Sequence, residues 1–149
     1  MKKTSALLVL VAAICLFTPD AAAQVSFGLR AGQYTDIEEP MVGVELITKI
    51  APHWYFNPNI EYVFVDDGDL VTFNADVHYD FTTGSNVLLV WAGGGLAVVH
   101  ENIVESDTNI GANILGGVGW RLGEVIPYVQ AKALLGDRDD FVVAGGIRF

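Results

Sequence analysis

Three side chains that could do chemistry stand at alternate positions in the segment TFNADVHYDF, residues 72–81. Asp76, His78 and Asp80 offer two carboxylates and an imidazole, the groups that bind metal ions or transfer protons. Alternate residues of a β-strand share one face but lie about 7 Å apart, which is far for three ligands of one ion. A network of hydrogen bonds and ion pairs needs only neighbours on adjacent strands. We therefore expect a network here rather than a metal site.

The other positions of this segment are apolar, so the segment reads as a strand with one apolar and one polar face. The same period of two recurs along the chain after Gln24, and Gly, Pro, Asn and Asp cluster between the segments. The pattern predicts one all-β domain over residues 24–149. Its eight expected strands are 25–34, 41–50, 55–65, 70–81, 87–99, 109–122, 126–135 and 141–149.

Residues 1–23 are expected to be a cleaved signal peptide. Lys2 and Lys3 precede the uncharged run 6–17, and Ala21-Ala22-Ala23 ends in the small-x-small pattern of a cleavage site. An uncleaved membrane anchor is the alternative, although the run is short of the about 20 residues that span a bilayer. Cys15 is the only cysteine. The mature chain would therefore leave the cytoplasm without using disulfides.

Charge and hydropathy narrow the class of protein. Cleavage removes two lysines and one aspartate, which takes the net charge from −10 to −11 and argues against nucleic acid or an anionic surface as a partner. The chain is nevertheless 52% hydrophobic, because one face of nearly every expected strand is apolar.

The opposite face carries five cations and four anions, nearly balanced. A surface in water needs no such balance, whereas a closed interior does, because an unpaired buried charge is costly. We therefore expect the apolar face to point outward and the charges inward, the pattern of a transmembrane β-barrel. The predicted lumen network, including the imidazole, is Arg30, Glu45, Lys49, Glu61, Asp76, His78, Asp80, Arg121, Lys132 and Arg148.

The connections sort the remaining acids to one end. The odd connections 35–40, 66–69, 100–108 and 136–140 hold three acids each, whereas the even connections hold only Glu124. We expect no cofactor, but the acidic loops leave loop-bound Ca²⁺ or Mg²⁺ open, since both ions take carboxylate oxygens. The alternative is a solvated acidic rim. The loop acids to which these two alternatives apply are Asp66, Asp67, Asp69, Asp137, Asp139 and Asp140.

Aromatic residues gather near the other end, which suggests a girdle at the membrane interface. Pro58 is awkward, because a closed barrel has no free edge for a residue without an N–H group. We therefore expect the turn before it to run to about Pro58. The expected girdle is Phe27, Trp54, Phe56, Tyr79, Phe81, Trp120, Tyr128 and Phe149.

The segments NILGGVGWRL, PYVQAKALL and FVVAGGIRF resemble the last three strands of the small OmpA/OmpX-type outer-membrane β-barrel family. The resemblance implies an eight-stranded antiparallel up-and-down transmembrane barrel in a bacterial outer membrane. It also implies Ile147 and Phe149 as an assembly signal, although Ala144 stands where that signal usually has Gly. The implied partners are outer-membrane lipid and lipopolysaccharide, with the barrel-assembly machinery and periplasmic chaperones during biogenesis. A monomer is expected.

Three other functional classes are the alternatives. A lipid A-modifying enzyme would need a nucleophile beside a base, and the histidines in PHW, VHY and VHE have no serine two residues away. A soluble lipocalin-type carrier would have the opposite polarity. A narrow porin-like pore for small solutes is the main alternative, but eight strands leave an interior that side chains fill. The sequence favours a structural or surface-interaction role with a plugged lumen.

Overall fold

The computed structural model describes residues 25–66, 68–102, 106–137 and 139–149. The expected signal peptide, residues 1–23, lies outside the described residues, as does Asp67. Within the described part, no helix is long and apolar enough to cross a membrane.

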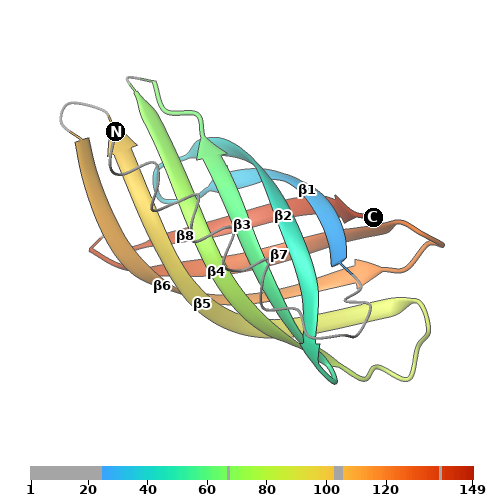
Figure 1. The fold of residues 1–149 in the computed structure, drawn as a ribbon. Coiled ribbons are helices and arrows are strands. Elements are labelled where there is room, and N and C mark those ends of the chain that lie inside the picture. Colours follow the sequence, from blue (N-terminus) through green and yellow to red (C-terminus); the bar gives the residue numbers. More distant parts are fainter. Residues whose placement is uncertain (1–24, 67, 103–105, 138) are drawn as a thin grey trace.

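Eight antiparallel strands form one closed sheet in which each strand pairs with its neighbour in sequence and β1 pairs with β8 (Figure 1). This confirms the predicted all-β barrel. The β1–β8 seam runs from Gly28 opposite Arg148 to Tyr34 opposite Val142. The strands are β1 (Val25–Tyr34), β2 (Glu39–Ala51), β3 (Trp54–Val63), β4 (Asp69–Phe81), β5 (Leu88–Asn102), β6 (Ser106–Trp120), β7 (Ile126–Gly136) and β8 (Asp140–Arg148).

The C-terminal residue completes the seam just past β8. The Phe149 N–H donates to the Phe27 carbonyl at 2.8 Å, and the Phe27 N–H donates to the Phe149 carbonyl at 3.3 Å. The Phe149 ring is exposed on the outside, as is Ile147. The two residues of the expected assembly signal therefore lie on the outer face of the closing strand.

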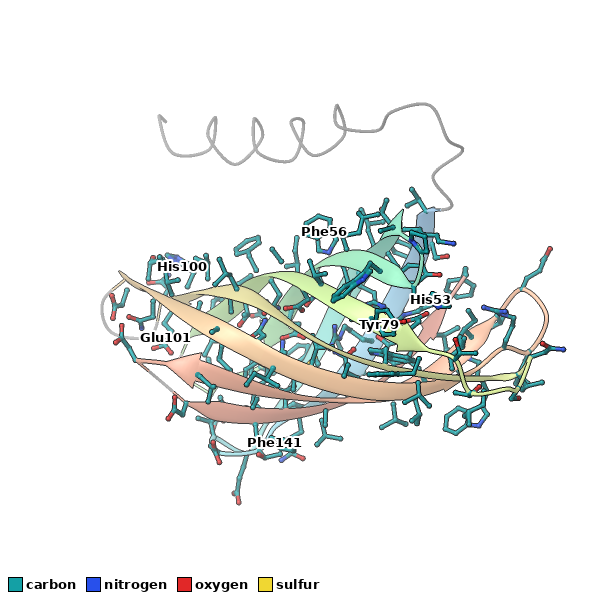
Figure 2. The ribbon with its side chains drawn as sticks, turned by 90° about the horizontal axis from the view of Figure 1, so that it is seen from below. His53, Phe56, Tyr79, His100, Glu101 and Phe141 are labelled. Atoms are coloured by element: carbon teal, nitrogen blue, oxygen red, sulfur yellow. The ribbon has the colours of Figure 1, made fainter. Side chains whose placement is uncertain are left out.

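The alternation of the strands separates the side chains as predicted. Large apolar side chains on the outside are well exposed, including Ile110 at 69% and Leu96 at 62%, whereas charged side chains on the same strands are buried. The apolar face therefore points outward and most of the strand charges point inward. Figure 2 places His53 and Tyr79 at one end of the barrel and His100 and Glu101 at the other. The second end is the one with the acidic connections, here called the acidic end.

The interior also contains an apolar layer, which the polar character of the inward positions does not predict. It lies at the acidic end, inside the barrel, where strands from all around it contribute side chains that are at most 6% exposed. Aliphatic residues at inward positions near the strand ends produce it. Its members are Tyr34, Met41, Val63, Leu70, Ala97, Val99, Leu134, Val142 and Ala144.

The expectation for Pro58 is wrong. Pro58 lies inside β3, opposite Ala75 of β4. On the other side, the β2–β3 pairs stop at Glu45 opposite Asn59 and resume at Thr48 opposite Phe56. In this gap the Asn57 side-chain amide donates to the Leu46 carbonyl at 2.8 Å. A side-chain donor therefore replaces the backbone N–H that proline lacks.

The expected connection 100–108 is also shorter than predicted. β5 continues to Asn102 and β6 begins at Ser106, so that Glu101 and Asp107 lie opposite one another in the sheet. The polar composition suggested a loop, but cross-strand pairing with β5 extends the hairpin. Glu39 and Asp69 are likewise first residues of strands.

Candidate functional site

Glu61 is the centre of the interior network. It is fully buried, and its carboxylate accepts hydrogen bonds from Lys132 Nζ at 2.9 and 2.7 Å and from the Tyr34 hydroxyl at 2.6 Å. Arg30 Nη2 lies 3.2 Å from Glu61 Oε1. Hydrogen bonds to an ionised group inside a protein are stronger than neutral ones. Polar groups from two other strands, β1 and β7, thus converge on one carboxylate of β3.

Glu45 forms a second centre nearer the other end. It is 1% exposed, and Arg148 Nε donates to its Oε1 at 2.9 Å. The Asn57 amide donates to Oε2 at 3.0 Å, and Arg30 Nη1 lies 3.8 Å from the same oxygen. Arg30 therefore lies between both glutamates and links the two centres electrostatically.

Asp76 is the third buried carboxylate of the network, and its hydrogen-bond donors are neutral side-chain amides. It is fully buried, and its two oxygens accept from the Asn59 amide at 3.0 Å and the Asn113 amide at 2.8 Å. Lys132, Arg30 and Arg148 then stand against Glu61, Glu45 and Asp76. Within this network the buried cations and anions are equal in number, as expected for charges in a closed interior.

Asp76, His78 and Asp80, which share one face of β4, lie in two different environments. His78 is 1% exposed, and its Nε2 lies 3.4 Å from Asp80 Oδ1, at the end opposite the acidic loops. The imidazole stacks on Tyr55 with 5.5 Å between ring centroids. Asp76 binds asparagine amides instead of joining this pair. Among the described residues, no group of three or more His, Cys, Asp or Glu side chains could hold a metal ion.

Lys49 and Arg121 do not belong to the buried network, contrary to expectation. Both side chains are exposed. Their positions follow the inward alternation, but Lys49 is near the end of β2 and Arg121 follows the last residue of β6. At the mouth of the barrel an inward position faces water. Asp80 is intermediate, with 23% of its side chain exposed.

Tyr128 also differs from its expected place in the aromatic girdle. It is 2% exposed and points inward, and the Arg148 guanidinium lies 4.4 Å from its ring centroid and 4.5 Å from that of Trp91. The space for these rings is opposite glycine: a Cβ on Gly117 would lie 2.4 Å from the Trp91 ring, and one on Gly146 would lie 2.5 Å from the Tyr128 ring. Glycine in these strands therefore makes room for large interior side chains.

The rest of the expected girdle lies on the outer face at one end. Trp54, Tyr79 and Phe81 form successive edge-to-face contacts, at 5.2 Å and 5.3 Å between centroids. Phe27, Trp120 and Phe149 are exposed, and Phe56 and Tyr79 are half-buried.

Most of the described acids of the expected outer loops are exposed, but Asp140 is not. It begins β8, is 4% exposed, and its carboxylate accepts from the backbone N–H groups of Asp36 and Phe141. This carboxylate serves the turns at the end of the barrel rather than a solvated rim. Asp69 accepts from the Tyr62 hydroxyl at 2.6 Å. Asp66, Asp137 and Asp139 are exposed.

Uncharged polar residues of the interior were missed by reasoning that followed charges. Asn74 illustrates their role: its amide donates to Asn59 at 2.9 Å, and its carbonyl oxygen accepts from Asn113 at 2.9 Å. The signal was present, because they occupy the same inward alternate positions as the charges. The set is Asn57, Asn59, Thr72, Asn74, Asn113 and Gln130.

One hydroxyl–imidazole pair lies on the outer face at the acidic end. His100 Nδ1 is 3.1 Å from Thr108 Oγ1. The two residues are directly opposite on β5 and β6, and directly opposed polar pairs are a common feature of sheets.

Comparison with known proteins yields structural likeness only. No family model and no curated protein matches the chain. The N-terminal β-barrel domain of Pseudomonas aeruginosa OprF is similar with a TM-score of 0.71 and 17% identity, covering 84% of this chain and 95% of that one. Neisserial surface protein A follows at 0.62 and 14%, covering 83% and 93%. The outer membrane enzyme PagL is similar at 0.50 and 12%, covering 83% and 96%. The fold is therefore that of small eight-stranded outer-membrane barrels.

Proposed function

We propose that this protein is an integral protein of a bacterial outer membrane, with lipid around its apolar outer face and a lumen plugged by its own side chains. The observation that carries the proposal is the inverted polarity of the barrel. Apolar residues such as Leu96 and Ile110 are exposed, whereas Glu61 and Asp76 are fully buried. In water this arrangement would expose a large apolar belt, but in a bilayer the belt contacts acyl chains.

The orientation follows from the ends of the strand order. β1 begins at Val25 and β8 ends at Arg148, both at the end opposite the acidic connections, and we place that end at the periplasm, from which an exported chain enters the membrane. The acidic end would face the outside, and the end with the aromatic residues Trp54 and Phe81 would lie at the periplasmic interface. The expected signal peptide would supply the route out of the cytoplasm. Lipopolysaccharide would then be the neighbour of the acidic end, with a single barrel as the functional unit.

The role we propose is structural or surface-interactive, in envelope integrity or adhesion. The paired, buried interior supports a plug: Arg30 and Lys132 both pair with Glu61, and all three side chains are almost completely buried. A conducting pore would need water beside these groups. Neisserial surface protein A is by its name a surface protein, which agrees with this class of role without specifying it.

An enzymatic role is the weaker proposal. PagL, one of the similar barrels, is an enzyme. Here the His78 imidazole is packed between the rings of Tyr55 and Trp91 and is 1% exposed, out of reach of a lipid substrate. His100 is accessible, but its partner Thr108 is a directly opposed strand residue. We expect His100→Ala to leave the lipid A acyl pattern of the host membrane unchanged in mass spectra.

Membrane fractionation with planar-bilayer recording tests the main proposal. The protein should fractionate with the outer membrane, show a heat-modifiable gel shift, and give no stable single-channel conductance. Recovery in the soluble periplasmic fraction would refute membrane insertion. Steady conductance from the intact barrel would refute the plug and favour the narrow pore.

A further inference from the structure

The inward-facing side chains change from polar to apolar within one step along the strands near the acidic end. In β3, Glu61 is followed by Val63 at the next inward position, and in β7, Lys132 is followed by Leu134. Tyr34 crosses the boundary, because its ring belongs to the apolar layer while its hydroxyl donates to Glu61 at 2.6 Å. The apolar layer therefore lies directly on the charged network, on the side of the acidic end.

The apolar layer forms an almost complete ring inside the barrel. Its members come from seven of the eight strands, all except β6. Met41 lies opposite Val63 in the sheet, and Val63 lies opposite Leu70, so the ring passes from β2 to β4 without a polar residue. Ile37 and Val65, from the connections at this end, pack against it. No member of the layer carries a charge, so a path through the lumen must cross a band of apolar side chains.

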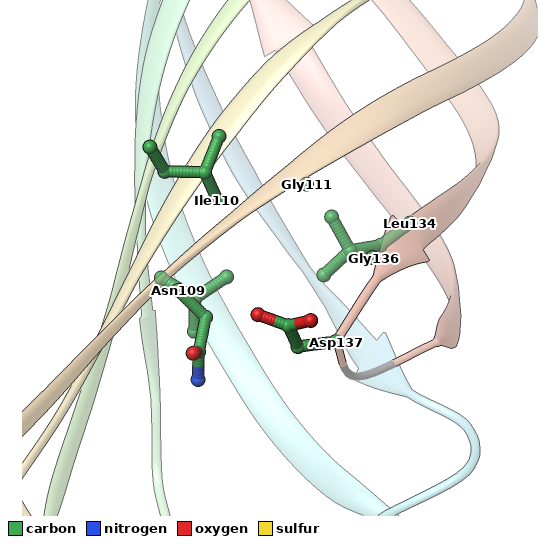
Figure 3. A pocket seen from close by; sticks show the side chains of 7 residues that line it. Asn109, Ile110, Gly111, Leu134, Gly136 and Asp137 are labelled. Atoms are coloured by element: carbon green, nitrogen blue, oxygen red, sulfur yellow. The ribbon is translucent and has the colours of Figure 1, made fainter.

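The ring is weakest at β6, where the inward residue is Gly111. This glycine lies opposite Ala97, a member of the layer. Leu134 covers the position from β7, since a Cβ on Gly111 would lie 2.9 Å from Leu134 Cδ1. The hollow beside it, which Asn109 and Asp137 also line, holds about 10 Å³, room for one water molecule (Figure 3). A single water molecule provides no continuous path for ions through the layer.

Among the described residues, the opposite end of the lumen has no comparable ring. Trp91, Leu115 and Tyr128 form an apolar cluster there, but they come from three neighbouring strands. The Arg148 guanidinium lies 4.5 Å from the Trp91 ring centroid, and Asp80 has 23% of its side chain exposed. Polar groups thus continue from this mouth to the network, whereas at the acidic end they stop at the apolar layer.

Water and ions behave differently in these two kinds of surroundings. The polar network offers hydrogen-bond donors and acceptors, which can replace part of the hydration of a passing water molecule or proton. An apolar constriction offers none, so that water is excluded from it and an ion loses its hydration without compensation. Even an empty space stays dry when its walls are apolar. The free-energy barrier to an ion is therefore highest in the apolar layer.

We propose that the apolar layer, and not the charged network, is the ion-tight seal of the lumen. Water that reaches the network from the opposite mouth goes no further than this layer. The ion pairs then stabilise the barrel, and they can be replaced without opening it. The inference rests on the proposed function, in which a plugged barrel spans a membrane.

The test measures proton flux into vesicles that contain the mature barrel and a trapped pH-sensitive dye, with a potassium diffusion potential as the driving force. Val63→Thr with Leu70→Asn makes the layer polar at nearly constant volume. This variant should raise the flux about tenfold, the effect of one or two new hydrogen-bond partners on the barrier. The matched variant, Val63→Ala with Leu70→Ala, removes more volume but adds no polar group. Its flux should stay within about twofold of the wild type, because small apolar cavities stay dry.

Replacement of the central ion pair is the second comparison. Glu61→Gln with Lys132→Met removes one anion and one cation, so the remaining buried charges of the network stay balanced. The Tyr34 hydroxyl also keeps an acceptor. The flux through this variant should stay within about twofold of the wild type, because the apolar constriction is intact.

The outcomes separate the possible barriers. Equal leaks in the alanine and polar variants would show that packed volume is the barrier, and a leak in the ion-pair variant would show that the network is. Either result overturns the inference, as does a polar variant that assembles and stays tight. A layer variant without the heat-modifiable gel shift is replaced by its Val63 substitution alone, with the same expected order of fluxes. High flux through the wild-type barrel would instead refute the plugged lumen of the proposed function.

Discussion

At the scale of single residues, position along the strand decides whether a charge matters for stability. Arg148 and Arg121 are the same residue type at inward alternate positions near one end of the barrel. Arg148 is 6% exposed and donates to Glu45, whereas Arg121 is exposed past the end of β6. The cost of removing a charge depends on whether its partner is then left buried and unpaired.

We expect Arg148→Met to reduce the free energy of unfolding by roughly 3–5 kcal/mol, because Glu45 loses its closest cation. Arg121→Met should change it by less than about 0.5 kcal/mol, as exposed substitutions usually do. Urea titrations of the barrel in lipid vesicles, followed by tryptophan fluorescence, measure both values. Equal effects of the two substitutions would show that Arg148 does not face a closed interior.

At the scale of elements, the β2–β3 seam depends on a side chain that substitutes for a backbone group. Pro58 interrupts the ladder, and the Asn57 amide binds both the Leu46 carbonyl and Glu45. One asparagine therefore connects the sheet hydrogen bonds to the interior network.

Asn57→Ala should destabilise the barrel by roughly 1–3 kcal/mol, because it leaves the Leu46 carbonyl and one oxygen of the buried Glu45 without this donor. In a Pro58→Ala background the restored N–H can bond to the Leu46 carbonyl, so the same substitution should cost less. A double-mutant cycle from urea titrations measures this coupling. Additive effects would mean that Asn57 does not compensate for the proline.

At the scale of the whole molecule, the last residue closes the barrel. Phe149 exchanges two backbone hydrogen bonds with Phe27, and its ring lies on the outer face. The resemblance to OmpA/OmpX-type barrels makes the same residue the expected assembly signal.

Phe149→Asp should sharply reduce the heat-modifiable form in cells, because it places a charge on the lipid-facing side of the closing seam. Asp139→Phe, in the exposed β7–β8 turn, is the control and should assemble normally. Refolding both purified variants in detergent separates the two possible causes. A defect in cells alone indicates recognition by the assembly machinery, and a defect in both settings indicates the seam itself.

At the acidic end, the question for the whole molecule is whether a divalent cation binds the exposed acids and stabilises the barrel. Asp66, Asp69 and Asp137 are exposed, and Asp69 is bound by the Tyr62 hydroxyl. We expect a solvated rim, so millimolar Ca²⁺ should leave the melting temperature in lipopolysaccharide-containing bilayers unchanged. A rise with Ca²⁺ that Asp66→Asn together with Asp69→Asn abolishes would instead indicate bridging by the ion.

The sequence by itself determined the number of strands, their two faces and the polarity of the barrel. These properties are local, because a strand alternates its side chains whatever its neighbours are. Tyr128 and Lys132 occupy the same set of alternate positions in β7, so alternation places both side chains inside. The expectation that Tyr128 belongs to the outer girdle was wrong because it did not follow this alternation.

Only the tertiary structure decided which inward residues meet and which reach water. Glu61 and Lys132 are 71 residues apart, and their contact depends on closure of the sheet and on its register. Lys49 and Arg121 have inward positions but lie at the mouth, a boundary that alternation does not encode. The substitute donor for Pro58 has the same origin. Each depends on where a neighbouring strand pairs or ends, which is a property of the closed sheet.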